Sequence, residues 1–530
     1  MELKQKRSCD LLVLGSGIAG LSAALAGAEA GASVVLACKG KLFSGSSFYP
    51  GTWGLGLIGP ADEADEEDLV RTIEAVGCGM ARDELVRALV SGIHPAIARL
   101  EAMGVKLRKA QGGADQREYI PCFDHKHRAW NGIEFDSARE VFSRKLEEMN
   151  VTVLPGREAL ELCREDGRVC GAVLSDGETL EYVSSRAVVL ATGGYGSLFR
   201  HHLCTGDVEG LGQALALDAG CSLINMEFMQ IMPGYLRPAY QTIFNEKVFR
   251  FTHMEADGRE ILPEADRERL LDLRSGHGPF TSRLASGEVD LAICRAGEGV
   301  AVRYDRELME NPPEFVKTYF DWLEQAKGLT MADPIQIGLF SHAANGGVRI
   351  ETDGSTGVPG LFAAGEVTGG MHGADRIGGL STANGLVFGG KAGTAAAKCA
   401  ADMPEPPASV EFLMEGGADC AGKFRRLQEV MSRYAMAERE GAGLTAALRE
   451  VETMTAELDL HPTEQVGEIT ASRRLMGQLK TARVILSAEL LREESRGSHY
   501  RADHPEENPA LARRIRAEEG EQGVEVRFED

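Results

Sequence analysis

Two short hydrophobic runs near the N-terminus flank a stretch rich in glycine and alanine. Residues 10–38, DLLVLGSGIAGLSAALAGAEAGASVVLAC, predict a buried strand, a tight glycine turn, an alanine-rich helix and a second buried strand. Residues 186–199, RAVVLATGGYGSLF, predict another buried strand that ends in the sequence ATGG. This succession of strands and helices favours an α/β fold.

Helical spacing of apolar residues occurs in two other regions. Residues 81–105 predict a long helix that we interpret as scaffold. Beyond the prolines at 404, 406 and 407 the chain becomes charged and helical, and its charge runs are typical of solvated helix faces. The last residues, VEVRFED, predict a short strand, and residues 236–345 are more polar than the sequence on either side.

Three glycines give the first turn its chemistry. Gly15, Gly17 and Gly20 directly follow the first strand and open the helix, which is the context that a GxGxxG motif requires. Such glycines allow a tight turn, a close approach to a pyrophosphate and close helix packing. The helix N-terminus adds unpaired N–H groups and a positive dipole end, so this segment predicts a dinucleotide site.

Residues 358–393, VPGLFAAGEVTGGMHGADRIGGLSTANGLVFGGKAG, combine many glycines with few polar side chains. The small residues allow the backbone to approach a planar ligand closely. The polar residues that we single out among these glycines are Glu366, His372, Arg376 and Ser381. The segment alone is also compatible with a structural turn before a packed helix, but the two other nucleotide-binding elements favour a ligand site.

Charge and cysteine content restrict the function classes. The chain of 530 residues has a formal net charge of −23, which argues against nucleic acid or an anionic membrane as a general partner. A local group of Arg and His could still bind an anionic substrate. The eleven cysteines lack a CxxC spacing, so they favour a reduced, cytoplasmic setting over disulfides, and no metal or iron-sulfur motif is present. No transmembrane segment or signal-like region is expected.

Taken together, these elements resemble the flavoprotein subunit family of fumarate reductase, succinate dehydrogenase and L-aspartate oxidase. The resemblance extends to residues 204–230, 341–354 and 494–509, and so covers nearly the whole chain. It implies a Rossmann-like FAD-binding domain, an inserted α+β capping domain and a C-terminal helical domain. The implied ranges are 1–235 and 346–403 for the FAD domain, 236–345 for the capping domain and 404–530 for the helical domain.

The resemblance also implies the residues that bind FAD. Many Rossmann-type FAD proteins carry an acid at the end of the second strand. This chain has Cys38 or Ala37 there, as the small polar residue of the family implies, and Glu366 is the implied acid for the flavin ribityl or ribose hydroxyls. Membrane-associated relatives attach flavin through a histidine near the position of Ser47, and this chain has no histidine before His94, so we expect noncovalent FAD. The expected FAD-binding residues are Gly15, Ser16, Gly17, Ala19, Gly20, Cys38, Lys39, Ser46, Ser47, Gly54, Glu158, Ala159, Ala191, Thr192, Gly193, Asp207, Glu366, Arg376, Gly379, Leu380 and Ser381.

For the substrate, the resemblance implies Arg376 as the carboxylate-binding arginine and His342 as a substrate histidine. A second family histidine is replaced by Met232, whose thioether cannot donate a hydrogen bond to a carboxylate. This replacement argues against fumarate, succinate and aspartate. A longer or less charged group could pack against the methionine instead.

The residue that delivers a proton is ambiguous in the sequence. Arg283, His277 and Arg274 all fall near the position that the family implies. A further alternative is that none of these three residues delivers the proton. His277 has an ordinary pKa near neutrality, which suits a general acid. In the segment 122–132, His127 or Arg128 could face the pocket, or the segment could be a solvated basic loop.

The leading hypothesis is a soluble FAD-dependent oxidoreductase that moves a hydride between flavin N5 and a carbon of a carboxylate-bearing organic acid. One alternative is a flavoprotein subunit that passes electrons to an iron-sulfur partner protein. Another is a flavin-binding sensor or storage protein without catalysis.

Overall fold

The computed structural model describes residues 1–52, 54–110, 117–521 and 523–529. Its largest sheet has eight strands, in the order β6-β2-β1-β9-β8-β7, with β17 beside β9 and β19 beside β1. The central strands run parallel and are apolar, as a sheet covered on both faces requires. The strands are β1 (Glu2–Leu14), β2 (Val34–Cys38), β6 (Thr152–Pro155), β7 (Glu158–Glu165), β8 (Arg168–Ser175), β9 (Leu180–Leu190), β17 (Leu361–Ala363) and β19 (Ser409–Glu411).

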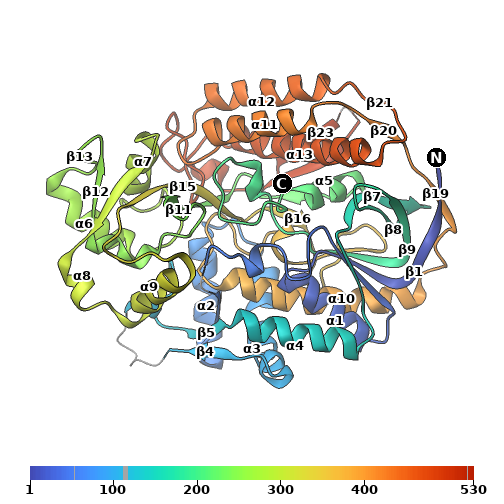
Figure 1. Ribbon diagram of the computed structural model, residues 1–530, viewed down its shortest axis with the longest axis horizontal. Helices are drawn as coiled ribbons and strands as arrows, with labels where there is room; N and C mark the ends of the chain where they lie inside the picture. The colour runs from blue at the N-terminus through green and yellow to red at the C-terminus, as the bar shows by residue number, and fades with distance from the viewer. Residues whose placement is uncertain (53, 111–116, 522, 530) are drawn as a thin grey trace.

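Two helices of small residues pack closely together against this sheet. They are α1 (Ile18–Glu29) and α10 (Leu380–Asp402), which lie side by side in Figure 1. A Cβ on Gly393 would come within 2.1 Å of the Ala23 carbonyl oxygen, and one on Gly389 within 2.5 Å of that of Ala19. Glycine is therefore required for this helix spacing, which brings the N-terminus of α10 near the glycine turn.

A smaller layer covers the other side of α10. It consists of a three-stranded antiparallel sheet in the order β3-β5-β4 and three helices, of which α3 matches the predicted scaffold helix. These elements are α2 (Glu63–Val76), α3 (Asp83–Met103), α4 (Phe135–Glu148), β3 (Leu55–Gly59), β4 (Leu107–Lys109) and β5 (Ala129–Ile133).

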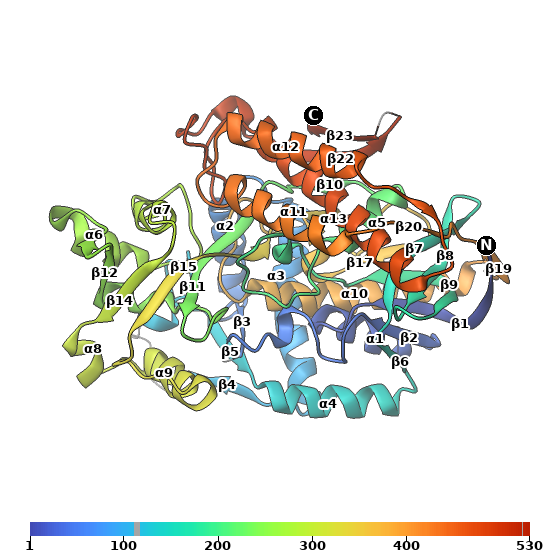
Figure 2. The ribbon, with the colours of Figure 1, turned by 45° about the horizontal axis from the view of Figure 1, so that its top comes forward.

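The inserted region forms its own antiparallel sheet, in the order β11-β15-β14-β12-β13, at the left of Figures 1 and 2. Its first strand begins at Met229, before residue 236, because β11 pairs along its whole length with β15. The elements are β11 (Met229–Arg237), β12 (Thr252–Ala256), β13 (Arg259–Glu260), β14 (Val300–Tyr304), β15 (Ile335–Ala344), α6 (Glu264–Arg274), α7 (Gly287–Arg295), α8 (Arg306–Glu310) and α9 (Glu314–Lys327).

The C-terminal region is helical, as predicted, and lies above the largest sheet in both ribbon views (Figures 1 and 2). Its helices are α11 (Cys420–Tyr434), α12 (Gly441–Ala456) and α13 (Val466–Leu491), and a short hairpin, β20 (Glu415–Gly416) with β21 (His461–Pro462), lies beside them. The described residues contain eleven unpaired cysteines.

A hairpin near residue 520 joins a second five-stranded sheet. Strand β22 pairs with β10, so that the strand order is β18-β16-β10-β22-β23. The first five residues of VEVRFED, 524–528, lie in β23, in agreement with the predicted strand. The elements of this sheet, with α5 packed beside it, are α5 (Leu211–Asp218), β10 (Leu223–Ile224), β16 (Gly347–Arg349), β18 (Thr368–Gly369), β22 (Ile515–Gly520) and β23 (Gly523–Phe528).

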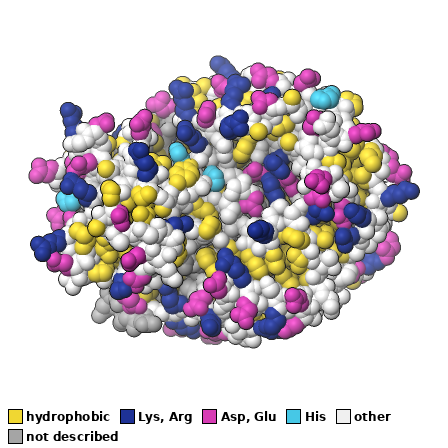
Figure 3. All heavy atoms as spheres, in the orientation of Figure 1, with side chains coloured by type: hydrophobic (Ala, Val, Ile, Leu, Met, Phe, Trp, Pro, Cys, Tyr) yellow, Lys and Arg dark blue, Asp and Glu magenta, His cyan; other side chains and the backbone are white. Residues whose placement is uncertain are grey.

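Charges of both signs are interspersed on the face in Figure 3, and this face carries no large basic patch. No helix among the described residues has the length and apolar character needed to cross a membrane. No group of three or more potential metal-ligating His, Cys, Asp or Glu side chains occurs in the same described part of the chain.

Candidate active site

A long cavity runs between the ends of the parallel strands, α1, α10 and the inserted sheet. Its non-atom volume is about 1710 Å³, which includes open solvent at its mouth. Most of the residues predicted for FAD and substrate line it. They are Gly15, Ser16, Gly17, Ala19, Cys38, Lys39, Ser46, Ser47, Gly54, Glu158, Ala159, Ala191, Thr192, Gly193, Asp207, His342, Glu366, Arg376, Gly379 and Ser381.

Two of the predicted FAD-binding residues, Gly20 and Leu380, do not line the cavity. A Cβ on Gly20 would lie 1.8 Å from the Gly15 carbonyl oxygen, so Gly20 supports the turn from behind. Leu380 is fully buried at the start of α10, where its side chain belongs to the hydrophobic core. Its neighbour Gly379 caps the helix with a φ of 85° and does line the cavity.

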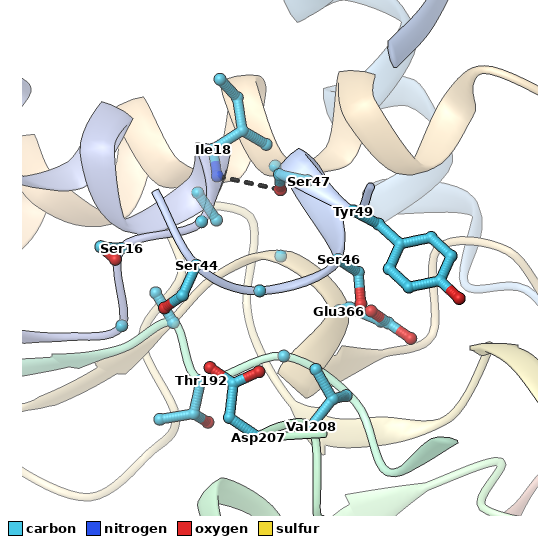
Figure 4. Close-up of a pocket in the computed structure, with 18 of the residues that line it drawn as sticks. Ser16, Ile18, Ser44, Ser46, Ser47, Tyr49, Thr192, Asp207, Val208 and Glu366 are labelled. Atoms are coloured by element: carbon cyan, nitrogen blue, oxygen red, sulfur yellow. Dashed lines mark hydrogen bonds between the residues drawn. The ribbon is translucent and has the colours of Figure 1, made fainter. Parts of the chain in front are cut away.

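The glycine turn places the N-terminus of α1 at the cavity wall. Gly15 has a φ of +112°, and a Cβ there would lie 2.2 Å from the carbonyl oxygen of Ala191. The Ile18 N–H, one of the free donors of the first turn, donates to Ser47 Oγ over 3.0 Å, as Figure 4 shows. The turn thus leaves a close-approach surface at Gly17 beside a helix N-terminus, which suits a pyrophosphate.

Several polar atoms of the cavity wall have no protein partner. Ser46 Oγ, Thr192 Oγ1 and Asp207 Oδ1 are buried and unpartnered among the described residues, and Figure 4 shows their side chains around the same space. Buried polar atoms are normally hydrogen-bonded, so these atoms indicate a polar ligand. Together with the glycine turn, they fit the phosphates and hydroxyls of FAD.

An ion-pair cluster closes one end of the cavity. Lys39 Nζ lies 2.9 Å from Glu158 Oε1 and also pairs with Glu209, while Arg474 Nη2 lies 2.5 Å from Glu158 Oε2. Burial alone would raise the pKa of Glu158, but the two cations hold it below its ordinary value. Arg474 comes from α13, so the C-terminal helices hold one wall of this end.

Glu366 lies in the part of the cavity away from Ser16 of the glycine turn, as Figure 4 shows. Its Oε1 accepts a hydrogen bond of 2.9 Å from the Ala344 N–H, and burial raises the pKa of its carboxyl group. In Figure 4, Tyr49 lies on the same side as Glu366 and away from Ser16. This end therefore contains the residues predicted for flavin and substrate.

Arg376 is buried in the cavity wall and is oriented by Gln230. Its Nε donates to Gln230 Oε1 over 2.9 Å and its Nη1 to the Ile377 carbonyl oxygen over 3.3 Å, while the Gln230 amide donates to the Arg376 carbonyl oxygen. The guanidinium has no carboxylate within salt-bridge distance among the described residues, and Nη2 has no acceptor there. A buried cation without an anionic partner is the chemistry of a carboxylate site.

His342 is neutral at physiological pH in this setting. Burial and the nearby Arg376 lower its pKa to about 3, and its Nδ1 is buried without a protein partner among the described residues. The imidazole can therefore offer one neutral hydrogen bond to a ligand in the cavity, but no second positive charge.

The three candidates for proton delivery do not line the cavity. Arg274 is fully buried and pairs with Asp290, with Nε 2.7 Å from Oδ2. Both ring nitrogens of His277 are hydrogen-bonded, to the Pro279 carbonyl oxygen and Ser286 Oγ, and burial lowers its pKa well below the ordinary value. Arg283 donates to Asp375 Oδ2 over 2.9 Å, so it contacts the residue that precedes Arg376 in the chain.

The basic segment 122–132 is held by acids. Arg128 is buried, with Nε 2.9 Å from Asp124 Oδ2 and Nη1 2.5 Å from Asp65 Oδ1. It does not line the cavity, and neither does His127. The segment is therefore neither a pocket wall nor a simple solvated loop, since its central arginine is buried.

Sequence reasoning missed several residues that line the cavity or contact its lining residues. Gln230 and Arg474 act through contacts between segments that are far apart in sequence, and only the first had a signal, because it lies in the family-like segment 204–230. The residues that were missed at the Arg376 end are apolar or aromatic and resemble ordinary core positions; they are Tyr49, Leu203 and Ile243.

The glycine turn at a helix N-terminus, the unpartnered polar wall and the inserted sheet are the features of a dinucleotide-binding flavoprotein. The chain matches the family models "FAD binding domain" over residues 10–257 and 291–382 and "Fumarate reductase flavoprotein C-term" over residues 424–528. It therefore belongs to the FAD-dependent oxidoreductase family of the fumarate reductase flavoproteins and L-aspartate oxidases.

Individual relatives agree with this assignment. The chain is 32% identical to an L-aspartate oxidase of Halobacterium salinarum, over 93% of this chain and 96% of the relative. It is 29% identical to a subunit of the CoM/CoB fumarate reductase of Methanothermobacter marburgensis, over 96% of each chain. The E. coli quinol fumarate reductase shares the fold, with a TM-score of 0.78 and 23% identity over 99% of this chain and 97% of that one.

Proposed function

We propose that this oxidoreductase exchanges a hydride between N5 of FAD and a carbon of a carboxylate-bearing organic acid, and that its substrate is neither fumarate nor succinate. The observation that carries the proposal is the buried Arg376 guanidinium, which has a free Nη2 in the cavity wall among the described residues. Position 232, where the family pattern has a second histidine, carries a methionine.

Bound FAD supplies the two-electron chemistry, and the residues of the chain supply binding and charge. Arg376 holds the substrate carboxylate and stabilises the negative charge that grows there as the neighbouring carbon reacts. Gln230 fixes the guanidinium from behind, so that little reorganisation is needed when the substrate binds. His342 contributes a neutral hydrogen bond.

We also propose that FAD is bound noncovalently. Ser47 occupies the neighbourhood of the family's flavin-linked histidine, and its hydroxyl is engaged by the Ile18 N–H. Acid precipitation of the holoprotein should therefore leave the yellow colour in the supernatant. A yellow pellet would contradict this proposal.

The hydride proposal is tested by anaerobic titration of the reduced holoprotein with a panel of unsaturated mono- and dicarboxylic acids. At least one acid should restore the absorbance of oxidised flavin, and Arg376→Gln should abolish the response while keeping FAD. Arg306→Gln, at a side chain that is 87% exposed, is the matched control. The proposal fails if no acid in the panel reoxidises the flavin.

A second candidate is a flavoprotein subunit that passes electrons to an iron-sulfur partner protein. It is favoured by the similarity to a protein that is named as one subunit of a fumarate reductase. Purification from native cells, followed by iron analysis, tests it. A single chain that is fully active without an iron-containing partner would count against it.

A further inference from the structure

The Arg376 end of the cavity is bounded by an apolar cluster. Tyr49, Leu203, Met232, Ile243 and Phe340 are all buried and pack together as a unit separate from the main core. Three of them, Tyr49, Leu203 and Ile243, line the cavity directly. Met232 on β11 and Phe340 on β15 are paired on neighbouring strands and belong to the same cluster, but neither lines the cavity.

The Tyr49 hydroxyl of this wall and the imidazole of His202, which lies outside the cavity lining, are already used by the protein. The Tyr49 hydroxyl donates to the Gln241 carbonyl oxygen. His202 Nδ1 is 2.9 Å from the Cys204 carbonyl oxygen, and the Gln241 amide contacts the same ring. Neither side chain is therefore free to receive a carboxylate, and the wall presents mainly carbon to the cavity.

The cavity lining also contains few cationic side chains that could bind a substrate anion. The cationic side chains among the described residues that line the cavity are Lys39, Arg157 and Arg376. Lys39 is paired with Glu158 and Glu209, and Arg157 lies 2.7 Å from Asp176, in the part of the cavity lined by Glu158 and Ala159. Within this described lining, Arg376 alone remains for a substrate anion. The described lining of the cavity thus offers one unpaired cation for a carboxylate, the neutral imidazole of His342 near it, and one apolar wall.

Resting on the proposed function, we propose that the substrate is an α,β-unsaturated monocarboxylic acid, or its saturated counterpart. Its β carbon carries an apolar group in place of a second carboxylate. The single carboxylate pairs with Arg376 and the apolar group packs against Tyr49, Leu203 and Ile243. Reduction adds a hydride to the β carbon and a proton to the α carbon, so that the double bond becomes a single bond and reduced FAD gives up the two electrons. A second carboxylate would lose its hydration against carbon without gaining a cationic partner.

Binding to the oxidised holoprotein tests the substrate class without requiring turnover. The probes are trans-2-pentenoate, fumarate and trans-2-pentenamide, followed by the change in flavin absorbance. The first differs from fumarate by an ethyl group in place of one carboxylate, and the third lacks any charge. We expect trans-2-pentenoate to bind at least tenfold more tightly than either of the others. Equal or tighter binding of fumarate or of the amide, or no binding of any probe, overturns the proposal.

A pair of variants ties the preference to the wall. Leu203→Gln introduces a donor on the cavity wall and should reduce the preference for trans-2-pentenoate over fumarate at least fivefold, whereas Leu203→Met keeps an apolar group there and should preserve it. An unchanged preference in Leu203→Gln contradicts the role assigned to this wall. Failure of the hydride proposal looks different, because the binding preference would then hold while neither acid reoxidised the reduced flavin.

Discussion

Alanine substitutions of Gly15 and Gly17 distinguish a glycine that the fold requires from one that leaves space for the ligand. In Gly17→Ala the new Cβ meets only Ser47 Oγ, at 3.3 Å, and the φ of −68° is open to any L-residue. In Gly15→Ala the Cβ would lie 2.2 Å from the Ala191 carbonyl oxygen at a φ of +112°. The apoprotein of Gly17→Ala should therefore be as stable as the unaltered apoprotein, whereas the apoprotein of Gly15→Ala should be less stable.

The magnitudes follow from these contacts. A methyl group forced into a filled site costs about 1–3 kcal/mol. If the pyrophosphate occupies the space over Gly17, the alanine variant should bind FAD about 5- to 150-fold more weakly, since 1.4 kcal/mol is a factor of ten. For Gly15→Ala a similar cost, about 1–3 kcal/mol for the strained backbone, falls on the protein itself.

Thermal melting of the apoprotein and fluorescence titration with FAD measure the two effects separately. Gly17→Ala should leave the melting temperature unchanged and weaken FAD binding, and Gly15→Ala should lower the melting temperature. Gly206→Ala, at a site with nothing within 4 Å, is the control that should change neither. If Gly17→Ala binds FAD within twofold of the unaltered protein, the placement of the pyrophosphate is refuted.

Three other substitutions have defined outcomes. Arg474→Ala should weaken FAD binding in fluorescence titrations, because Glu158 loses its 2.5 Å partner at the cavity end. Arg274→Met leaves the carboxylate of Asp290 buried and unpaired, which should destabilise the fold by about 3–5 kcal/mol in denaturant unfolding, and the double variant with Asp290→Leu should recover much of the loss. The unfolded state protonates His342 below about pH 6.5, whereas the folded state does so only near its pKa of about 3, so stability falls with acidity over this range. His342→Gln should therefore lose less stability than the unaltered protein between pH 6.5 and pH 4, measured by the same unfolding experiment.

Local patterns in the sequence predicted many of the residues that line the cavity. The glycine turn, the ATGG strand end and the segment around Glu366 each carry their chemistry within a few residues, so the sequence alone places them. These segments meet in one cavity because parallel strands bring their carboxyl ends to the same edge.

The substrate end was harder to predict because it is assembled from distant segments. Tyr49, Leu203 and Ile243 become a single wall only when the inserted sheet packs over the glycine turn. His277 illustrates the opposite difficulty: its ordinary pKa suggested a general acid, yet its ring is buried and both nitrogens are engaged. Burial and tertiary hydrogen bonds, which no local pattern encodes, decide such cases.

The terminal hairpin also has a consequence for how the protein is made. Strand β22 pairs with β10, which lies almost 300 residues earlier and beside β16 and β18. During synthesis the edge of β10 therefore stays exposed until residues 515–520 emerge from the ribosome, and an open strand edge is a site of misassembly. Nascent chains that stop short of this hairpin should depend on chaperones more than chains that include it.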